Sequence, residues 1–375
     1  ARVKVTTYNL HHGSFLPVKL WPPQHQSLTG LGGAFRLIQS TDQGEALVDT
    51  EYAALHGIQR GEVTGGCFCC RFSDLVEVIA QLRKHAPDVV FAEPVGSCTD
   101  ISATTLHPLL ADEQIRLAPY TVLVDPERAS DLLRDGADPN LAFLFRRQIE
   151  EADLVCFTKS DLGGQPPAMT VAAARQISAR TGQGVAEWLD EVLSGELSSG
   201  RTILDIDYEQ YARAEAALAW LNAEATLHCS PPLSPARVLG PLFERLDADL
   251  TAAGIRIVHL KAILRADTGF VKAAICANGQ EPVVEGNLDA SPASWHVLLL
   301  NLRAAGPAAT VRAVIERDLA TVGHEVTNRR VACFHPAPPR PERGMERPPL
   351  NAIAHPRAAS PRATEPPRRH SSSGS

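Results

Sequence analysis

The chain has 375 residues, an apolar share of 44% and a formal net charge of -7 at pH 7. This length exceeds one typical domain and predicts two globular domains with a tail. No apolar run approaches the roughly 18 residues that cross a bilayer, so a membrane partner is not expected. The negative charge argues against broad nucleic-acid binding, which requires Lys and Arg to neutralise phosphates.

The start of the chain and its cysteines add two expectations. Residue 1 is Ala, and no charged segment followed by an apolar one opens the chain, which favours a fragment over a processed product. Of the eight cysteines, three crowd into positions 67, 69 and 70. Neighbouring cysteines cannot join distant elements without strain, so we expect a reducing cytoplasm rather than a secreted disulfide framework.

The first half of the chain alternates short apolar runs with amphipathic segments, which predicts βαβ units on a parallel sheet. Residues 73–85 have apolar side chains at helical spacing, and Ser73 is a suitable N-cap. Further helices are expected over 143–151 and 185–193. The predicted strands are 35–38, 89–93, 121–125 and 154–158.

Turn residues without periodicity fill 193–202 and predict a boundary between a domain over 1–197 and a domain over 201–335. The second domain should hold helices over 208–222, 235–253 and 307–322, with strands over 255–266, 270–277, 296–303 and 329–334. This order predicts a small, mainly antiparallel α+β domain with helices on one face. Residues 336–375 are rich in Pro, Arg and Ser, which predicts a disordered, solvated tail whose removal leaves metal binding and the fold intact.

The sequence Gly-Gly-Cys-Phe-Cys-Cys at 65–70 places three thiols directly before the predicted helix over 73–85. Thiolates suit Zn²⁺, Cu(I) and similar ions, and a helix N-terminus favours the thiolate form. The alternative is a small apolar turn, but three cysteines in four positions favour a metal site at Cys67, Cys69 and Cys70. Three ligands leave one coordination position open. Cys98 has two interpretations, a member of this cluster or a small buried residue, and the second is favoured.

A second motif, Thr158-Lys159-Ser160-Asp161, follows the predicted strand over 154–158. In P-loop GTPases a strand ends in Asn-Lys-x-Asp, whose carboxylate accepts two hydrogen bonds from guanine, and adenine offers no such pair of donors. The similarity implies guanine recognition by Asp161, with Ser178 and Ala179 in a second guanine loop. The alternative is a solvated strand end.

A third motif is the strand over 89–93, which ends in Glu93 and is followed by Gly96. In P-loop GTPases a carboxylate at this strand end orients the Mg²⁺ shell, and the glycine amide senses the γ-phosphate. The similarity implies catalytic roles for Glu93 and Gly96. A strand followed by a proline turn is the alternative.

Together these strings resemble CobW-like GTPases of the CobW/HypB/UreG nucleotide-binding group. The matching segments are 41–50, 65–72, 92–100 and 158–161. The resemblance implies an α/β fold, with a P-loop GTPase-like, mainly parallel sheet covered by helices on both faces and a smaller α+β C-terminal domain. It also implies binding of GTP and Mg²⁺, with Asp42, Thr158 and Lys159 among the contacts. Delivery of Zn²⁺ or another thiophilic or cobalt-like ion to a client metalloprotein is the implied role.

Residues 12–23 depart from the family pattern. The family has Gly-Phe-Leu-Gly-x-Gly-Lys-Thr-Thr here, whose backbone amides hold phosphates. This chain lacks those glycines and the Mg²⁺-binding hydroxyl, and Pro22 and Pro23 obstruct the following helix, so weak or no nucleotide binding is expected. Either the protein is a degenerate pseudo-GTPase or a reading-frame or start error affects residues 1 to about 40. The abrupt change at Gln39-Ser40 favours the error.

Two functions therefore compete. The first is a GTPase in which hydrolysis changes the geometry around the three cysteines. The second is a non-catalytic metal-binding or scaffolding protein with the same fold. A redox role for Cys69-Cys70 is weaker, because a disulfide between adjacent residues is strained.

Overall fold

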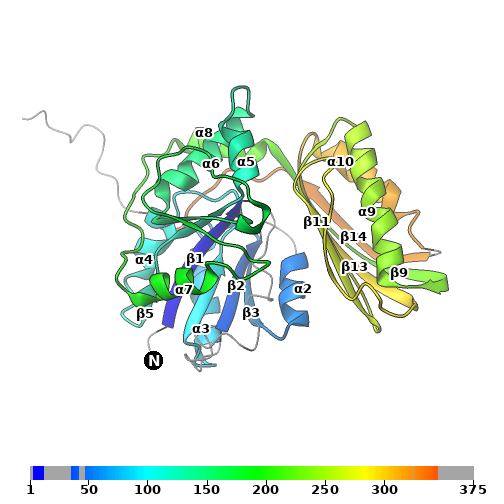
Figure 1. The fold of residues 1–375 in the computed structure, drawn as a ribbon, viewed down its shortest axis with the longest axis horizontal. Helices are drawn as coiled ribbons and strands as arrows, with labels where there is room; N and C mark the ends of the chain where they lie inside the picture. The colour runs from blue at the N-terminus through cyan, green and yellow to red at the C-terminus, as the bar shows by residue number, and fades with distance from the viewer. Residues whose placement is uncertain (1–2, 12–34, 42–46, 324, 345–375) are drawn as a thin grey trace, which may run out of the picture. The chain divides into compact units, whose positions relative to one another are not determined.

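The sheet formed by the first half of the described chain is parallel. The computed structural model describes residues 3–11, 35–41, 47–323 and 325–344. Within those ranges the sheet has eight strands, in the order β3-β2-β4-β1-β6-β7-β8, with β5 also paired to β1. Figure 1 labels β1, β2, β3 and β5 of this sheet. The strands are β1 (Val3–His11), β2 (Phe35–Thr41), β3 (Gln59–Thr64), β4 (Val89–Glu93), β5 (Ile115–Leu117), β6 (Thr121–Val124), β7 (Leu154–Phe157) and β8 (Ala174–Gln176).

Strand β1 lies in the middle of this sheet. Its backbone pairs with β4 from Lys4 to Thr7 and with β6 from Tyr8 to His11, both in parallel. The sequence analysis did not predict β1, although its β-branched and aromatic residues are typical of a strand. The altered phosphate loop expected at 12–23 and the nucleotide contact expected at Asp42 lie outside the described residues.

Alternate side chains of the central strands face two helix layers. Val122 and Val155 share a core cluster with residues of α5 (Pro126–Leu133) and α6 (Pro139–Glu151). Leu123 instead packs with residues of α7 (Val185–Ser194). Because strand side chains point to opposite faces in turn, helices cover both faces, which confirms the predicted α/β architecture.

The second sheet is antiparallel. The described residues give it six strands, in the order β12-β11-β10-β13-β9-β14. Helices α9 (Pro235–Ala252) and α10 (Ala308–Leu319) share one core cluster with the buried side chains of this sheet, as predicted for a smaller α+β domain. The strands are β9 (Leu218–Leu233), β10 (Arg256–Ala266), β11 (Gly269–Ile275), β12 (Val283–Gly286), β13 (Ala293–Ala305) and β14 (Glu325–Phe334).

The helix predicted over 208–222 is wrong in its second half. Helix α8 (Tyr208–Ala216) ends early, and β9 begins at Leu218 and pairs with both β13 and β14. Buried Leu221, Ala223 and Ala225 alternate with polar residues, which is a strand pattern. The alanines of this region favour a helix locally, but pairing with two neighbouring strands overrides that preference.

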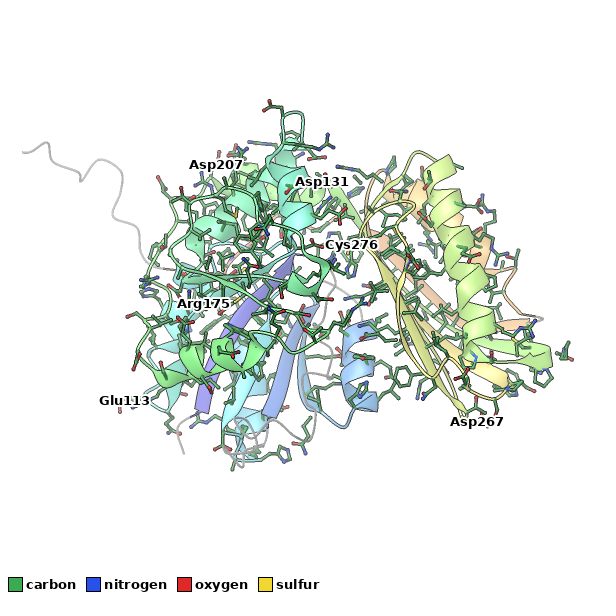
Figure 2. The ribbon with its side chains drawn as sticks, in the orientation of Figure 1. Glu113, Asp131, Arg175, Asp207, Asp267 and Cys276 are labelled. Atoms are coloured by element: carbon green, nitrogen blue, oxygen red, sulfur yellow. The ribbon has the colours of Figure 1, made fainter. Side chains whose placement is uncertain are left out.

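Helix α8 lies beyond the domain boundary predicted near residue 200, but it packs with the helices that precede that boundary. Tyr211 and Ala214 pack against Phe143 and Leu144 of α6, so α8 belongs with the helices of the parallel sheet. Asp207 caps α8 by accepting hydrogen bonds from two backbone N–H groups, and Figure 2 labels this residue. The antiparallel sheet therefore starts at Leu218.

The remaining helices in the described ranges are short. No helix there is long and apolar enough to cross a membrane. The remaining helices are α2 (Val48–Leu55), α3 (Phe72–Arg83), η2 (Ser102–Leu106), α4 (His107–Leu109) and η3 (Ser160–Leu162).

The disordered tail predicted from residue 336 differs from the structure over its first residues. The compact unit extends to Gly344, so the chain after β14 is ordered for several residues more. The rest of the predicted tail, 345–375, lies outside the described residues.

Candidate metal and nucleotide site

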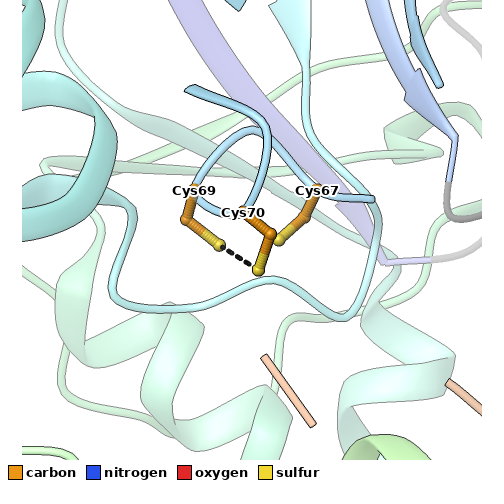
Figure 3. Close-up of side chains that lie close together, drawn as sticks. All are labelled: Cys67, Cys69 and Cys70. Atoms are coloured by element: carbon orange, nitrogen blue, oxygen red, sulfur yellow. Dashed lines mark hydrogen bonds between the residues drawn. The ribbon is translucent and has the colours of Figure 1, made fainter. Parts of the chain in front are cut away.

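Cys67, Cys69 and Cys70 lie in one tight turn between β3 and α3. The backbone N–H groups of Cys70 and Arg71 donate to the Cys67 carbonyl at 3.1 Å and 3.0 Å. Gly65 enters the turn with φ 80°, which residues with a side chain rarely adopt. The three Sγ atoms lie within 4.8 Å of one another, and Figure 3 shows them pointing toward a common centre. The structure therefore brings the three predicted ligands together.

The spacing of these sulfurs suits a tetrahedral ion. A Zn–S bond of about 2.3 Å places tetrahedral sulfur ligands about 3.8 Å apart. The Sγ atoms of Cys69 and Cys70 are 3.7 Å apart. Cys67 and Cys69 are buried and Cys70 is half-buried, so an ion held here would be shielded from water on one side.

Hydrogen bonds among the thiols shift their pKa values in opposite directions. Hydrogen bonds from the thiols of Cys69, Cys70 and Cys98 lower the pKa of Cys67. Hydrogen bonds with Cys67, Cys70 and Cys98 raise the pKa of Cys69, and its burial adds to that shift. The hydrogen bond with Cys67 is the largest cause that raises the pKa of Cys70 to about 12. The thiols are thus coupled, and loss of a proton from one of them is stabilised by hydrogen bonds from its neighbours.

A C-terminal strap, residues 336–344, covers this turn. The backbone N–H of Arg340 donates to Cys70 Sγ at 3.1 Å. The backbone N–H of Glu342 donates to the Cys69 carbonyl at 2.8 Å. These bonds contradict the expectation that the chain from residue 336 is a solvated extension without contact to the metal site.

Glu342 also caps helix α3. Its carboxylate accepts hydrogen bonds from the Ser73 backbone N–H at 2.9 Å and the Ser73 hydroxyl at 2.7 Å. Both hydrogen bonds lower the pKa of Glu342. Ser73, predicted as the N-cap, lies just inside the helix, and Glu342 supplies the acceptor from a distant part of the chain.

The second predicted feature is the β4 loop, residues 94–101, which follows Glu93. Gln148 of α6 donates through Nε2 to the carbonyls of Gly96 at 3.1 Å and Cys98 at 2.7 Å. Ser97 Oγ donates to Glu215 of α8 at 2.7 Å. Helices α6 and α8 therefore hold the backbone beside Gly96, the predicted γ-phosphate sensor.

Sequence reasoning missed the residues that hold this loop. Beside Gln148 and Glu215, Tyr211 accepts from the Thr99 backbone N–H at 3.2 Å, and Glu151 accepts from the Ser102 backbone N–H at 2.5 Å. All four are buried polar side chains. Their only signal in the sequence is polarity on the apolar face of a helix, which does not identify a partner.

The guanine loops predicted from the sequence meet in the structure. Ser178 Oγ donates to Asp161 Oδ1 at 2.6 Å and accepts from the Thr181 backbone N–H at 3.1 Å. Ala179 follows Ser178 in the same loop and is half-buried. Asp161 is thus oriented by the second loop, although 17 positions separate it from Ser178.

Thr158 and Lys159 serve the backbone and a neighbouring carboxylate. The Thr158 hydroxyl donates to the Val124 carbonyl at 3.2 Å and is buried. Lys159 adopts φ 58° and places Nζ 2.5 Å from Asp125 Oδ2. Burial acts to lower the pKa of Lys159, but Asp125 outweighs burial and the pKa is raised. Both side chains therefore have partners at the strand end, and their contacts with a nucleotide stay a prediction.

Glu93 and Asp161 follow the carboxyl ends of β4 and β7. In the sheet order, β1 and β6 lie between these strands, and all four are parallel. The residues predicted to contact the phosphates and the base of a nucleotide therefore lie along one edge of the sheet. Three strand spacings separate them by about 14 Å. This edge is where open α/β sheets bind their ligands.

Comparison with known proteins gives one family. Residues 38–184 match the family model described as CobW/HypB/UreG, nucleotide-binding domain, and this segment contains the three cysteines, the β4 loop, Asp161 and Ser178. No curated protein matches the chain.

Three solved structures illustrate the similar proteins. The Zn(II)-bound YjiA GTPase from E. coli is 13% identical, with 84% of this chain and 98% of that chain covered and a TM-score of 0.31. HypB from Helicobacter pylori in complex with nickel is 15% identical, with 52% and 89% covered and a TM-score of 0.36. The hydrogenase maturation factor HypB from Archaeoglobus fulgidus is 16% identical, with 50% and 87% covered and a TM-score of 0.31.

Proposed function

Because residues 38–184 belong to the CobW/HypB/UreG nucleotide-binding family, we propose that this protein is a metallochaperone-type GTPase whose metal affinity depends on its nucleotide state. The observation that carries the proposal is the gathering of the Cys67, Cys69 and Cys70 sulfurs within 4.8 Å in that domain. The metal ion is the cargo. A Zn²⁺-like ion suits the three sulfur donors, and a client metalloprotein is the proposed recipient.

The residues proposed to contact the nucleotide lie along the carboxyl edge of the parallel sheet. Asp161 accepts from guanine and Ser178 orients its carboxylate. Glu93 orients the Mg²⁺ shell, and the Gly96 amide responds to the γ-phosphate. Bound Mg²⁺ would neutralise charge on the transferred phosphoryl group. The cysteine turn and the β4 loop share one core cluster through Cys67, Cys69 and Cys98, so a shift of the loop reaches the thiols.

A coupled site of this kind must be reciprocal. If GTP changes the zinc affinity by some factor, zinc changes the GTP affinity by the same factor. A measurement of both affinities, each with and without the other ligand, tests the coupling. Equal zinc affinity with and without saturating GTP, in a chain that binds both, contradicts it.

The metal site itself is tested by stoichiometry under reducing conditions. We expect about one Zn²⁺ per chain, and loss of that ion when Cys67, Cys69 and Cys70 are all replaced by Ser. Cys156→Ser is the matched control, because Cys156 is a fully buried thiol in β7 outside the cluster. If the triple variant retains the parent's zinc, the cysteine turn is only packing.

A non-catalytic metal-binding or scaffolding role is the second candidate. The departure of residues 12–23 from the phosphate-loop pattern, including Pro22 and Pro23, favours it. GTP binding by this chain, compared with the same chain carrying an intact phosphate loop, separates the two functions. Zinc binding without GTP binding in both chains supports the second candidate.

The state of the thiols bears on where the protein works. All eight cysteines are free of disulfides. Thiol ligands remain available for metals only where they stay reduced, so we place the protein in the cytoplasm.

A further inference from the structure

Cys98 of the β4 loop lies against the metal cluster. Its side chain is fully buried, with 0% exposed, and belongs to the same core cluster as Cys67 and Cys69. Hydrogen-bond interactions link the Cys98 thiol to the Cys67 and Cys69 thiols. A thiol from a second loop therefore borders the group that Cys67, Cys69 and Cys70 form.

The backbone of Cys98 is held firmly in this position. Its N–H donates to the Val95 carbonyl at 2.8 Å, and its carbonyl accepts from Gln148 Nε2 at 2.7 Å. Gln148 is itself fully buried. A metal ligand benefits from a backbone that is already held in place, because less of the chain has to be ordered when the ion binds.

We propose that Cys98 is the fourth thiolate ligand of the metal site. With Cys67, Cys69 and Cys70 it completes a tetrahedral set of sulfur ligands. This inference rests on the proposed function of the cysteine turn. It fills the coordination position that three ligands leave open and makes the site a closed one, as structural zinc sites are. The ligand class is a thiophilic divalent cation.

The charge balance of this site is complete. Binding of one Zn²⁺ by four thiols forms four Zn–S bonds, releases four protons and leaves a net charge of about -2 on the cluster. The Arg340 N–H that donates to Cys70 Sγ places a positive dipole at one of the sulfurs and offsets part of the cost of the buried charge.

Cys98 also gives nucleotide state a direct route to the metal. Gly96, the proposed γ-phosphate sensor, is two residues before Cys98, and Gln148 bonds to the carbonyls of both. A shift of the β4 loop would carry Cys98 away from the other three sulfurs. The site would then change from four thiolates, which hold the ion, to three, which leave a position for a recipient ligand.

The test counts sulfur ligands. X-ray absorption of the zinc-loaded full chain, without nucleotide, is expected to show four sulfur neighbours at about 2.3 Å. In the Co²⁺-loaded protein, Cys98→Ala is expected to remove about one quarter of the cobalt–thiolate charge-transfer absorption, because one of four thiolates is lost. Cys156→Ala, which removes an equally buried thiol outside the cluster, should leave that absorption unchanged.

The outcomes separate this inference from the proposed function. Three sulfurs plus an oxygen or nitrogen neighbour in the parent, or an unchanged cobalt spectrum in Cys98→Ala, overturns the role of Cys98 and leaves the metallochaperone proposal intact. A parent chain that binds neither ion overturns both. The parent's absorption spectrum needs no substitution, so an unfolded Cys98 variant does not prevent a decision.

Discussion

The backbone N–H of Arg340 donates to Cys70 Sγ at 3.1 Å, although the two residues are 270 positions apart in the chain. A hydrogen bond to a thiolate stabilises its charge and orients its lone pairs toward a metal. The C-terminal strap is therefore part of the cysteine site, together with Glu342, whose carboxylate caps the helix that follows the cysteines.

Removal of the strap should weaken metal binding. A chain that ends at His335 loses the N–H donors of Arg340 and Glu342, and we expect its zinc affinity to fall about 10-fold or more. A chain that ends at Gly344 keeps both donors and should match the parent. Competition with a chelator measures the affinity, and equal affinity of both truncated chains and the parent would show that the strap is only packing.

Asp161→Asn should relax nucleotide selectivity. In a chain with an intact phosphate loop, the preference for GTP over ATP is expected to fall on the order of 100-fold or more, because Asn cannot accept both guanine hydrogen bonds. The Asp161 side chain is 16% exposed, but Asn can still accept from Ser178 and the ion pair that is lost, with Arg180 at 3.8 Å, has a solvated partner. Stability should therefore change by no more than about 1 kcal/mol. Equal GTP and ATP affinity in the parent contradicts the assignment.

Glu151→Gln should change the pH dependence of stability. Burial raises the pKa of Glu151 from 4.5 to about 8. Between these values the folded state holds a proton that the unfolded state has released, so the contribution of Glu151 is complete below pH 4.5 and is lost as the pH rises to about 8. Gln does not titrate.

The measurement is the melting temperature of both proteins between about pH 5 and pH 8, the window set by the raised pKa of Glu151. As the pH rises, the melting temperature of Glu151→Gln should rise relative to that of the parent. Glu150→Gln, on the exposed side of the same helix, tests whether any such change in α6 has this effect. A constant difference between Glu151→Gln and the parent contradicts the raised pKa.

Asp49→Asn should be strongly destabilising. Asp49 of α2 forms a short ion pair with Lys261 of β10 and lies 3.7 Å from Lys272 of β11. Both lysines are largely buried, and burial lowers the pKa of each. Loss of the carboxylate leaves buried positive charge without this partner. We expect the free energy of unfolding to fall by about 3–5 kcal/mol.

The matched control is Glu51→Gln, two residues along α2. Glu51 pairs with Arg265 at 3.1 Å, and the Arg265 side chain is 47% exposed. A solvated pair of this kind contributes at most about 1 kcal/mol. Chemical denaturation measures both variants, and a similar cost for the two would show that Asp49 is not an essential counter-ion.

Some elements could be predicted to the residue because their signals are local. The apolar run of β4 is bounded by Asp88 and Pro94, and its predicted ends are those of the structure. Helix α6 was predicted to begin at residue 143, but Asp138 caps it and Pro139 occupies its first turn. That Asp-Pro pair is a helix-start signal in the sequence, and it was overlooked.

Part of the candidate metal site could be predicted from local sequence, and part could not. The clustering of Cys67, Cys69 and Cys70 follows from their positions in one short turn, so the sequence alone predicted three ligands. The role favoured for Cys98 was that of a small buried residue, because no local pattern joins it to a turn about 30 residues away. Its place beside Cys67 depends on α3 packing against β4.

The sequence by itself predicted the resemblance to the CobW/HypB/UreG nucleotide-binding domain, the α/β class, the cysteine turn and the Asp161 motif, because each depends on residues close together in the chain. The tertiary structure decided what surrounds them. The hydrogen bonds that Arg340 donates to Cys70, Ser73 to Glu342 and Gln148 to Cys98 all join residues at least 50 positions apart. Such pairs form only after burial of the two sheets' cores has offset the entropy of closing long loops, and no local pattern encodes them.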